Sequence, residues 1–360
     1  MEEVIRKYIA AIKSTDFIRY EKRFSNAIVA ALTKGFQKGH REDRIVKVIE
    51  SIINKIHDLR GSADDAHITT NAAFVHGNKS HVEFDCYGGK TTKELGDMIF
   101  IISVIFKKRK YLEKMTICSF KKEPPRDPKW QIDREQLYLL SRFPEFKGVR
   151  GIAPKGTEHA LPNYSGCLGA YALLYRPGDF AFLSATRLER FLGPRKSLRR
   201  NDLHLVSYRD EYCHAFRFSI KQFPTFFMLR DMICMALKFS GQSDLWVCPD
   251  THFDDCHFAD NVFDFTHKYL TMGIGEPLYM KDALSNAQAR RFLLQVMNAL
   301  KRKTSDETVC ATRCDTVADG FLRYGYATDA LDDTKHVANT ESDNDGGSIG
   351  IVHTTINLGE

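Results

Sequence analysis

One segment, residues 97–106, constrains the possible folds of this chain more than any other. Met98 to Phe106 is a run of nine residues that is apolar apart from Ser103. A run that is apolar on both faces is typical of a central strand that is covered on both sides of a sheet. The run is also far shorter than the roughly 20 residues that a membrane-spanning helix needs. The sequence therefore predicts a buried central strand and no transmembrane span.

Helical and extended patterns alternate around this strand. Apolar side chains at helical spacing predict helices before it, the strongest over residues 41–59. Asp133 is placed to cap a further helix, in which Leu137, Leu140 and Phe143 recur. Short extended segments are expected at residues 81–85, 115–122, 172–175 and 180–184. This order predicts an α/β fold with a mixed sheet flanked by helices.

Changes in composition along the chain suggest four parts. After Lys303 the sequence turns to Asp, Thr, Asn and Gly, which is typical of a segment that does not fold by itself. Residues 186–303 contain apolar segments of their own, notably 223–239, and predict a second globular part of α+β type. The expected parts are an N-terminal helical segment (1–40), an α/β core (41–185), a C-terminal globular part (186–303) and an acidic, partly disordered tail (304–360).

The charge of the chain is divided between a basic body and an acidic tail. The net charge is +6, but residues 306–360 hold eleven acidic and three basic side chains. Residues 1–305 therefore carry a net charge of +14. A body of that charge favours a polyanionic partner, nucleic acid first, because each neutralised phosphate releases counterions. A lysine-rich surface that binds no polyanion is the alternative interpretation.

Cysteine usage and the N-terminus indicate a cytoplasmic protein that does not bind a membrane. The nine cysteines are odd in number and scattered, and a chain of 360 residues has no need of disulfides, so reduced thiols are expected. The N-terminus is acidic and lacks the basic and apolar regions of a signal peptide. We therefore expect a cytoplasmic location, and the sequence allows a homodimer.

Polar side chains that could carry chemistry are predicted to meet at one end of the central strand. Asp97 stands directly before this strand, and the next strand ends with Ser119, Phe120, Lys121 and Lys122. Strand alternation places Ser119 and Lys121 on one face, and a hairpin between the two strands would bring Asp97 beside them. A carboxylate that binds Mg²⁺ and a lysine that steadies the attacking water suit phosphodiester cleavage. The alternative is a weak ion pair at a solvated rim.

The order of these residues resembles the PD-(D/E)xK nuclease superfamily, which has the restriction-endonuclease-like fold. The resemblance rests on an acid-x-x-Asp sequence, Glu94 to Asp97, before an apolar strand, and on a second strand that ends in a short residue, any residue and Lys121. It covers about residues 41–185. It implies that Asp97 binds the metal, that Lys121 is catalytic, and that a glutamine of the following helix, Gln136, contributes to the site.

One position departs from the pattern of the superfamily. Two residues before the lysine the superfamily has Asp, Glu or, in one variant, Gln, whereas this chain has Ser119. A hydroxyl is a poorer Mg²⁺ ligand than a carboxylate. Members of the superfamily often add an acid from the first helix or strand, and the resemblance makes Glu50, Glu83 and Glu94 candidates for it, with Glu94 preferred. Either Glu83 or Glu94 could supply the missing charge. Otherwise catalysis is impaired, or the domain is an inactive binding scaffold.

The resemblance and the charge together predict a Mg²⁺-dependent DNA endonuclease, in which Mn²⁺ could replace Mg²⁺, with a role in restriction or phage defence. DNA is favoured over RNA as the partner. The alternative is a non-catalytic nucleic-acid-binding or sensor protein on the same scaffold. Two basic clusters are candidates for phosphate contacts: the turn Lys107, Lys108, Arg109 and Lys110, and the segment Arg187, Arg190, Arg195, Lys196, Arg199 and Arg200.

A last candidate is a zinc site. Cys248, His252, Cys256 and His257 stand within ten residues, and zinc binds such side chains. Their spacing matches none of the usual zinc patterns, however, and the adjacent Cys256 and His257 tend to point apart. An ordinary loop is therefore the preferred interpretation.

Overall fold

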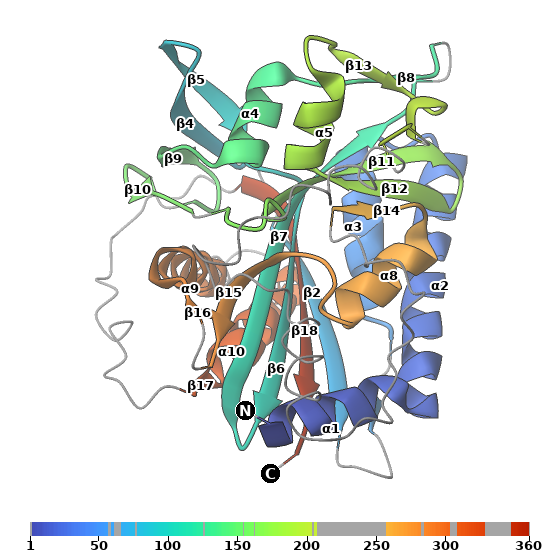
Figure 1. Cartoon of the computed structure of the whole chain (residues 1–360), viewed down its shortest axis with the longest axis vertical. Helices are drawn as coiled ribbons and strands as arrows, with labels where there is room; N and C mark the ends of the chain where they lie inside the picture. Colours follow the sequence, from blue (N-terminus) through green and yellow to red (C-terminus); the bar gives the residue numbers. More distant parts are fainter. Residues whose placement is uncertain are drawn as a thin grey trace, which may run out of the picture.

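In a computed structural model of the chain, one large mixed sheet is flanked by helices on both faces (Figure 1). The expectation of a mixed α/β fold is therefore confirmed. The structure describes residues 2–56, 59–60, 66–75, 78–124, 127–153, 155–161, 163–203, 205–206, 257–281, 284–302, 308–327 and 347–359. The apolar segment 223–239 and part of the expected tail, residues 304–307, 328–346 and 360, lie outside the described residues.

Eight helices are described. They are α1 (Glu2–Lys13), α2 (Thr15–Gln37), α3 (Glu42–Ile53), α4 (Arg134–Arg142), α5 (Ala185–Leu192), α8 (Val262–Leu270), α9 (Ala287–Arg302) and α10 (Thr308–Leu322). None of these helices has the length and apolar character that a membrane span requires.

The described strands form three sheets. The path through the large sheet is β1 (Leu59–Arg60), β2 (His67–Val75), β18 (Gly347–Asn357), β6 (Met98–Phe106), β7 (Arg109–Lys122), β11 (Gly169–Arg176), β12 (Asp179–Ser184) and β14 (Phe258–Ala259). Its side branches are β3 (Asn78–Lys79), β15 (Glu276–Met280), β16 (Leu284–Ser285) and β17 (Gly325–Tyr326). The second sheet is β10 (Glu158–His159), β9 (Phe146–Arg150), β4 (His81–Cys86) and β5 (Gly89–Glu94), and the third is β13 (Ser197–Arg199) with β8 (Lys129–Gln131).

Strands β6 and β7 form the long antiparallel hairpin that the sequence predicts. Their register begins with Met98 opposite Cys118 and continues to the turn. Every residue of β6 is buried, as expected of a strand that is covered on both faces. At the turn, Lys107 and Lys108 have positive φ angles of 48° and 59°, which is the backbone of a tight two-residue hairpin.

The C-terminal strand β18 lies in the middle of the large sheet. It pairs in antiparallel fashion with β2 and in parallel fashion with β6. Strands β14, β15 and β17, which also come late in the chain, pair with β12 or β7. Residues 347–357 are therefore part of the core and not of an acidic tail. Strands from before and after the expected domain boundary at residue 185 belong to the same sheet.

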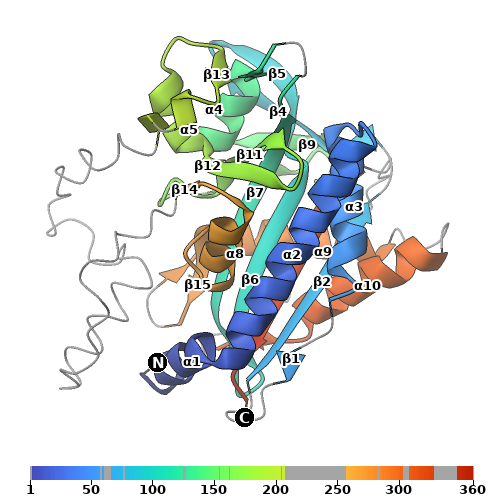
Figure 2. The same ribbon diagram turned by 90° about the vertical axis from the view of Figure 1, so that its right-hand side faces the viewer.

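Each face of the large sheet has its own apolar core. Helices α1, α2, α3 and α8 cover one face, which is turned towards the viewer in Figure 2, and Phe100 packs there against Phe265 and Tyr269. Helices α4, α5, α9 and α10 contribute to the core on the other face, to which Ile99 and Ile101 point. Because alternate residues of β6 serve the two cores, the whole strand is apolar.

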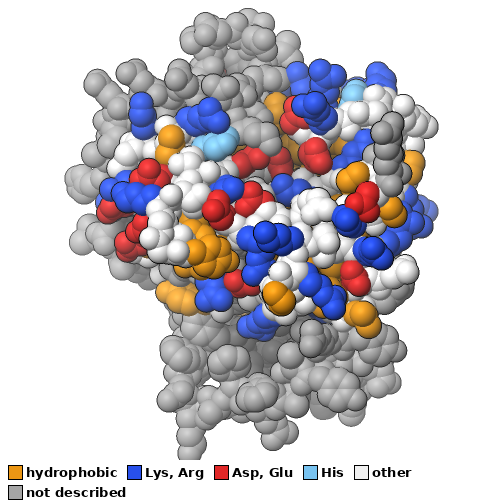
Figure 3. Space-filling view, turned by 90° about the horizontal axis from the view of Figure 1, so that it is seen from above, with side chains coloured by type: hydrophobic (Ala, Val, Ile, Leu, Met, Phe, Trp, Pro, Cys, Tyr) orange, Lys and Arg blue, Asp and Glu red, His pale blue; other side chains and the backbone are white. Residues whose placement is uncertain are grey.

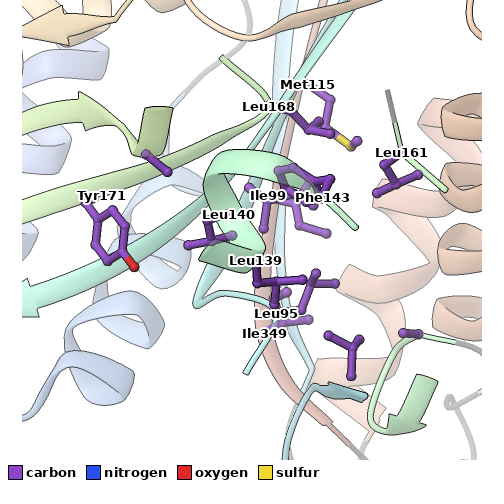
Figure 4. Close-up of a cluster of buried hydrophobic side chains, with 14 of the residues drawn as sticks. Leu95, Ile99, Met115, Leu139, Leu140, Phe143, Leu161, Leu168, Tyr171 and Ile349 are labelled. Atoms are coloured by element: carbon purple, nitrogen blue, oxygen red, sulfur yellow. The ribbon is translucent and has the colours of Figure 1, made fainter. Parts of the chain in front are cut away.

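Helix α4 lies in the connection between β7 and the parallel strand β11. Asp133 caps it as predicted, because its Oδ1 accepts the N–H groups of Glu135 and Gln136 at 2.9 and 3.0 Å. The helix approaches β11 closely at Gly169, where a Cβ would collide with the carbonyl of Leu140. Figure 4 shows the apolar side chains that α4 buries against the sheet.

Candidate functional site at the start of β6

The first pair of the predicted site residues, Asp97 and Ser119, meets at the open end of the β6–β7 hairpin. The hydroxyl of Ser119 donates to Oδ2 of Asp97 at 3.1 Å. The backbone N–H of Phe120 donates to the same oxygen at 2.7 Å. The backbone N–H of Asp97 in turn donates to the carbonyl of Cys118 at 2.9 Å. This juxtaposition follows from the antiparallel register that the sequence predicts.

The site is more deeply buried than the end of a strand usually is. Asp97 is 6% exposed and Ser119 is fully buried. Lys121 is the next residue of β7 on the same face, and its side chain is half-buried. Within the described part of the chain, Lys121 forms no salt bridge. The adjacent Lys122 faces the other side, where its Nζ donates to the carbonyl of His40 at 3.0 Å.

Tyr171 of β11 extends the row of polar side chains. The β7–β11 register places it directly beside Ser119. Its hydroxyl is buried and has no hydrogen-bond partner among the described residues. Burial raises the pKa of Tyr171 well above its usual value, and the nearby charges of Asp133 and Asp97 act in the same direction. Tyr171 is not among the residues predicted from the sequence, although a tyrosine in an otherwise apolar strand is a signal for it.

Charged side chains surround the first turn of α4. Lys93 Nζ lies 2.7 Å from Oδ2 of Asp133 and 2.9 Å from Oε2 of Glu135. Partial burial acts to raise the pKa of Asp133, but the hydrogen bonds from Lys93 and from the helix N–H groups outweigh it and lower this pKa. The hydrogen bonds from Lys93 and Thr91 lower the pKa of Glu135 as well. Both carboxylates are therefore ionised and paired with Lys93.

Gln136 and Glu94 are in contact, but not through the carboxylate of Glu94. Gln136 is buried, and its Nε2 donates to the backbone carbonyl of Glu94 at 3.2 Å. This bond ties α4 to the end of β5, just before Asp97. Gln136 therefore holds the backbone that leads to Asp97.

The two other candidate acids have partners of their own. Glu83 lies on β4, with Oε1 3.5 Å from Nζ of Lys90, and it lines a small pocket of about 110 Å³ of which Asp97 is not part. Glu50 is buried on α3. Nη1 of Arg313 donates to its two carboxylate oxygens, Oε1 and Oε2, at 3.0 and 3.1 Å. Neither contact joins these acids to Asp97.

The described residues contain no group of three or more His, Cys, Asp or Glu side chains placed to hold a metal ion. Mg²⁺ is often bound through one or two carboxylates, with waters and substrate phosphates completing its oxygen ligands. Asp97 offers one carboxylate for such a site, and the hydroxyl of Ser119 lies beside it. The remaining ligands would have to come from water and from a phosphate.

The first basic cluster does not form a common surface. Lys107 and Lys108 are at the hairpin turn, and the nine residues of β6 place them roughly 30 Å from Asp97. Lys110 is 1% exposed, with its Nζ 2.7 Å from Oε1 of Glu113, so the prediction that it contacts phosphate is wrong. Arg109 donates to the carbonyl of Tyr326 at 3.4 Å. A turn sequence of four basic residues could not reveal that one of them points into the core.

The second basic cluster lies on and after α5 and on β13, at the end of the molecule away from the β6–β7 turn (Figure 1). Arg187 is buried and donates to the carbonyl of Val206 through Nε and Nη2, so it is not available to a phosphate. Arg200 binds Glu123 and the carbonyl of Tyr175. The remaining members are exposed: Arg190, Arg195, Lys196 and Arg199. Seen from this end, Lys and Arg side chains alternate with acidic ones (Figure 3).

Three of the four candidate zinc ligands, Cys248, His252 and Cys256, lie outside the described residues. The fourth, His257, has its Nδ1 2.8 Å from the hydroxyl of Ser184 and 3.6 Å from Sγ of Cys167. The zinc site stays a prediction.

Comparison of the chain with protein-family models, with curated proteins and with solved structures gave no match. The function is therefore inferred from the side chains themselves.

Proposed function

We propose that this protein cleaves phosphodiester bonds of DNA with the help of Mg²⁺, on a restriction-endonuclease-like fold. The observation that carries the proposal is the contact of Asp97 with Ser119, with Lys121 next on the same face of β7. Four exposed basic side chains of the segment 190–199 lie at the same end and could hold the phosphate backbone.

Each residue has a separate role in this proposal. Asp97 presents a carboxylate oxygen, with the hydroxyl of Ser119 beside it. The ammonium of Lys121 holds the attacking water or stabilises the negative charge that develops on the phosphate. Gln136 fixes the segment before Asp97 through the carbonyl of Glu94. Mg²⁺, when bound, supplies positive charge to the phosphate and makes a bound water more acidic.

Nicking of supercoiled plasmid tests these roles. In Mg²⁺ or Mn²⁺, the wild-type protein is expected to nick, whereas Asp97→Asn and Lys121→Ala proteins bind the plasmid without nicking it. Lys122→Ala is the matched control, because it removes the same charge from the same strand on the opposite face. Equal nicking by all four proteins would show that the cleavage does not arise at this site.

A second candidate function is non-catalytic binding of nucleic acid, as in a sensor protein. It is favoured by Ser119, whose neutral hydroxyl stands where the superfamily has a metal ligand. Ser119→Asp distinguishes the two functions. On a catalytic scaffold the added carboxylate should increase nicking, and Mg²⁺ should raise the melting temperature of the variant more than that of the wild type. DNA binding with no cleavage by either protein in Mg²⁺ or Mn²⁺ would favour the sensor.

A further inference from the structure

A basic groove lies between α2 and α3, on the face of the sheet opposite α4. It has a volume of about 570 Å³, and we call it the α2–α3 groove. The charged and titratable side chains that line it are Lys34, His40, Asp43, Arg44, Lys47 and Lys55. All four Lys and Arg residues of this set are exposed. The groove belongs to neither of the basic clusters that the sequence analysis singled out.

The positive charge of the groove is not neutralised by salt bridges. None of its four Lys and Arg side chains forms one within the part of the chain that the structure describes. The other acids of α3 are bound elsewhere: Glu42 accepts the backbone N–H of Lys122 at 3.0 Å, and Glu50 binds Arg313. Asp43 is the one acid in the groove lining. Four cationic groups against one acid make the groove attractive to anions.

The basic side chains of α3 follow a line. Arg44, Lys47 and Ser51 are three and four residues apart, so they share one face of the helix, and Lys55 continues the spacing just beyond it. At 1.5 Å per residue, the line from Arg44 to Lys55 is roughly 16 Å long. A single small anion would need a compact cluster. A line of this length suits several phosphates of a polymer backbone.

One end of the groove adjoins the strand that carries the candidate site. The carbonyl of His40, a groove residue, accepts a hydrogen bond from Nζ of Lys122 at 3.0 Å. Lys122 directly follows Lys121 in β7. A nucleic-acid strand held along α3 could therefore continue over the end of β7 towards Lys121 and Asp97.

We propose that the α2–α3 groove binds the phosphate backbone of a nucleic acid, with Arg44 and Lys47 of α3 and Lys55 just beyond its end as the contacts. That the nucleic acid is DNA rests on the proposed function. The binding of backbone phosphates by the groove follows from its charge and shape, and it is independent of whether Asp97 supports cleavage.

Fluorescence anisotropy with a labelled DNA duplex in EDTA, over a range of salt concentrations, tests this groove with the full chain. The variant Arg44→Gln/Lys47→Gln/Lys55→Gln is expected to bind on the order of 100-fold more weakly at 0.1 M salt, and the slope of log K against log salt should fall by about 2 to 3. Arg6→Gln/Lys22→Gln/Arg23→Gln is the matched control. It removes three exposed positive charges from α1 and α2 outside the groove lining, and its slope should change by less than about 1.

Three results would overturn the proposal. Equal binding by the groove variant and the wild type would show that the groove does not contact DNA, and equal weakening by both triple variants would show a mere effect of net charge. Vesicles of anionic lipid provide the third comparison. If the wild type binds these vesicles more tightly than DNA, and the groove variant binds both weakly, the groove binds a membrane surface. Because EDTA prevents cleavage, failure of the nuclease proposal leaves these binding results unchanged.

Discussion

The two ends of the β6–β7 hairpin differ in how completely their buried polar and charged groups are hydrogen-bonded. Near the turn, Glu113 accepts hydrogen bonds from Lys110 at 2.7 Å, from Ser103 at 3.2 Å and from the hydroxyl of Tyr326 at 2.7 Å. Nζ of Lys110 also lies 3.4 Å from the centre of the Phe321 ring. A buried ion pair with this many partners is internally satisfied, so it fixes the packing of β7 and offers nothing to a ligand.

At the open end, the polar groups are less completely matched. Oδ2 of Asp97 accepts hydrogen bonds from two neutral groups, the Ser119 hydroxyl and the Phe120 N–H. The hydroxyl of Tyr171 has no partner among the described residues. Buried polar groups that lack partners are uncommon in folded proteins. Charge near the turn therefore serves stability, whereas at the open end a buried hydroxyl, that of Tyr171, lacks a partner among the described residues.

Removal of Glu113 is expected to have the largest effect on the free energy of unfolding. It tests whether the charges near the turn serve only stability. Glu113→Ala leaves the ammonium of Lys110 buried without its carboxylate, which should reduce the free energy of unfolding by about 3–5 kcal/mol. Urea denaturation measures the loss. The double variant Lys110→Met/Glu113→Leu should recover most of it, because no charge is then buried. A loss below about 1 kcal/mol for Glu113→Ala would mean that Lys110 reaches water, as an exposed pair does.

The pH dependence of stability also distinguishes the turn end. His353 Nε2 lies 3.1 Å from the Ser103 hydroxyl, and burial, with a smaller contribution from Lys110, lowers the pKa of His353 to about 3. An unfolded histidine titrates near 6.5, so the folded state binds fewer protons below that pH. Stability present above pH 6.5 is therefore lost as the pH falls towards 3. Between pH 6.5 and 4 the expected loss is about 3 kcal/mol.

Urea denaturation at a series of pH values checks this expectation with His353→Asn. The variant should lose less stability on acidification than the wild type. It should keep part of the slope, because burial also lowers the pKa of His159 to about 4. Identical slopes for the two proteins would mean that His353 binds protons as readily in the folded state as in the unfolded state.

Truncation of Asp97 is expected to cost less than truncation of Glu113. Asp97→Ala leaves the Ser119 hydroxyl and the Phe120 N–H without their common acceptor, which should lower the free energy of unfolding by about 1–3 kcal/mol. Ser119→Ala should cost less, since Asp97 keeps its bond to Phe120. Thermal and urea unfolding of both variants give the comparison. A cost for Asp97→Ala as large as that of Glu113→Ala would remove the contrast between the two ends.

The smallest effect is expected at Tyr171, and its sign is the informative quantity. Tyr171→Phe removes a buried hydroxyl without a partner in the described structure, so stability should be unchanged or rise by up to about 1 kcal/mol. The melting temperature measures this change. A clear decrease would show that the hydroxyl has a partner in solution, such as an ordered water at the site.

Elements that depend on local pattern agree well between sequence and structure. The apolar run of β6, the extended pattern of β4 and the Asp133 cap of α4 each report a preference of neighbouring residues, and each is present. The contact of Asp97 with Ser119 follows as well, because a hairpin fixes the register of adjacent strands. These features needed no knowledge of the rest of the chain.

Features that depend on distant pairing were not predictable from local pattern. Strand β18 inserts between β2 and β6, although the composition before it suggested a disordered tail. The pairing of β7 with β11 places Tyr171 at the site. The α2–α3 groove likewise combines residues of two helices into one surface.

The central place of a fully apolar strand was predictable from the residues alone, as was the position of Asp97, Ser119 and Lys121 at one end of its hairpin, because strand alternation and hairpin register are local rules. The burial of Lys110 and Arg187, and the partners of each buried polar group, depend on the tertiary structure. Those outcomes depend on what distant segments bring to the same place, since burial makes a charge costly unless a partner arrives with it.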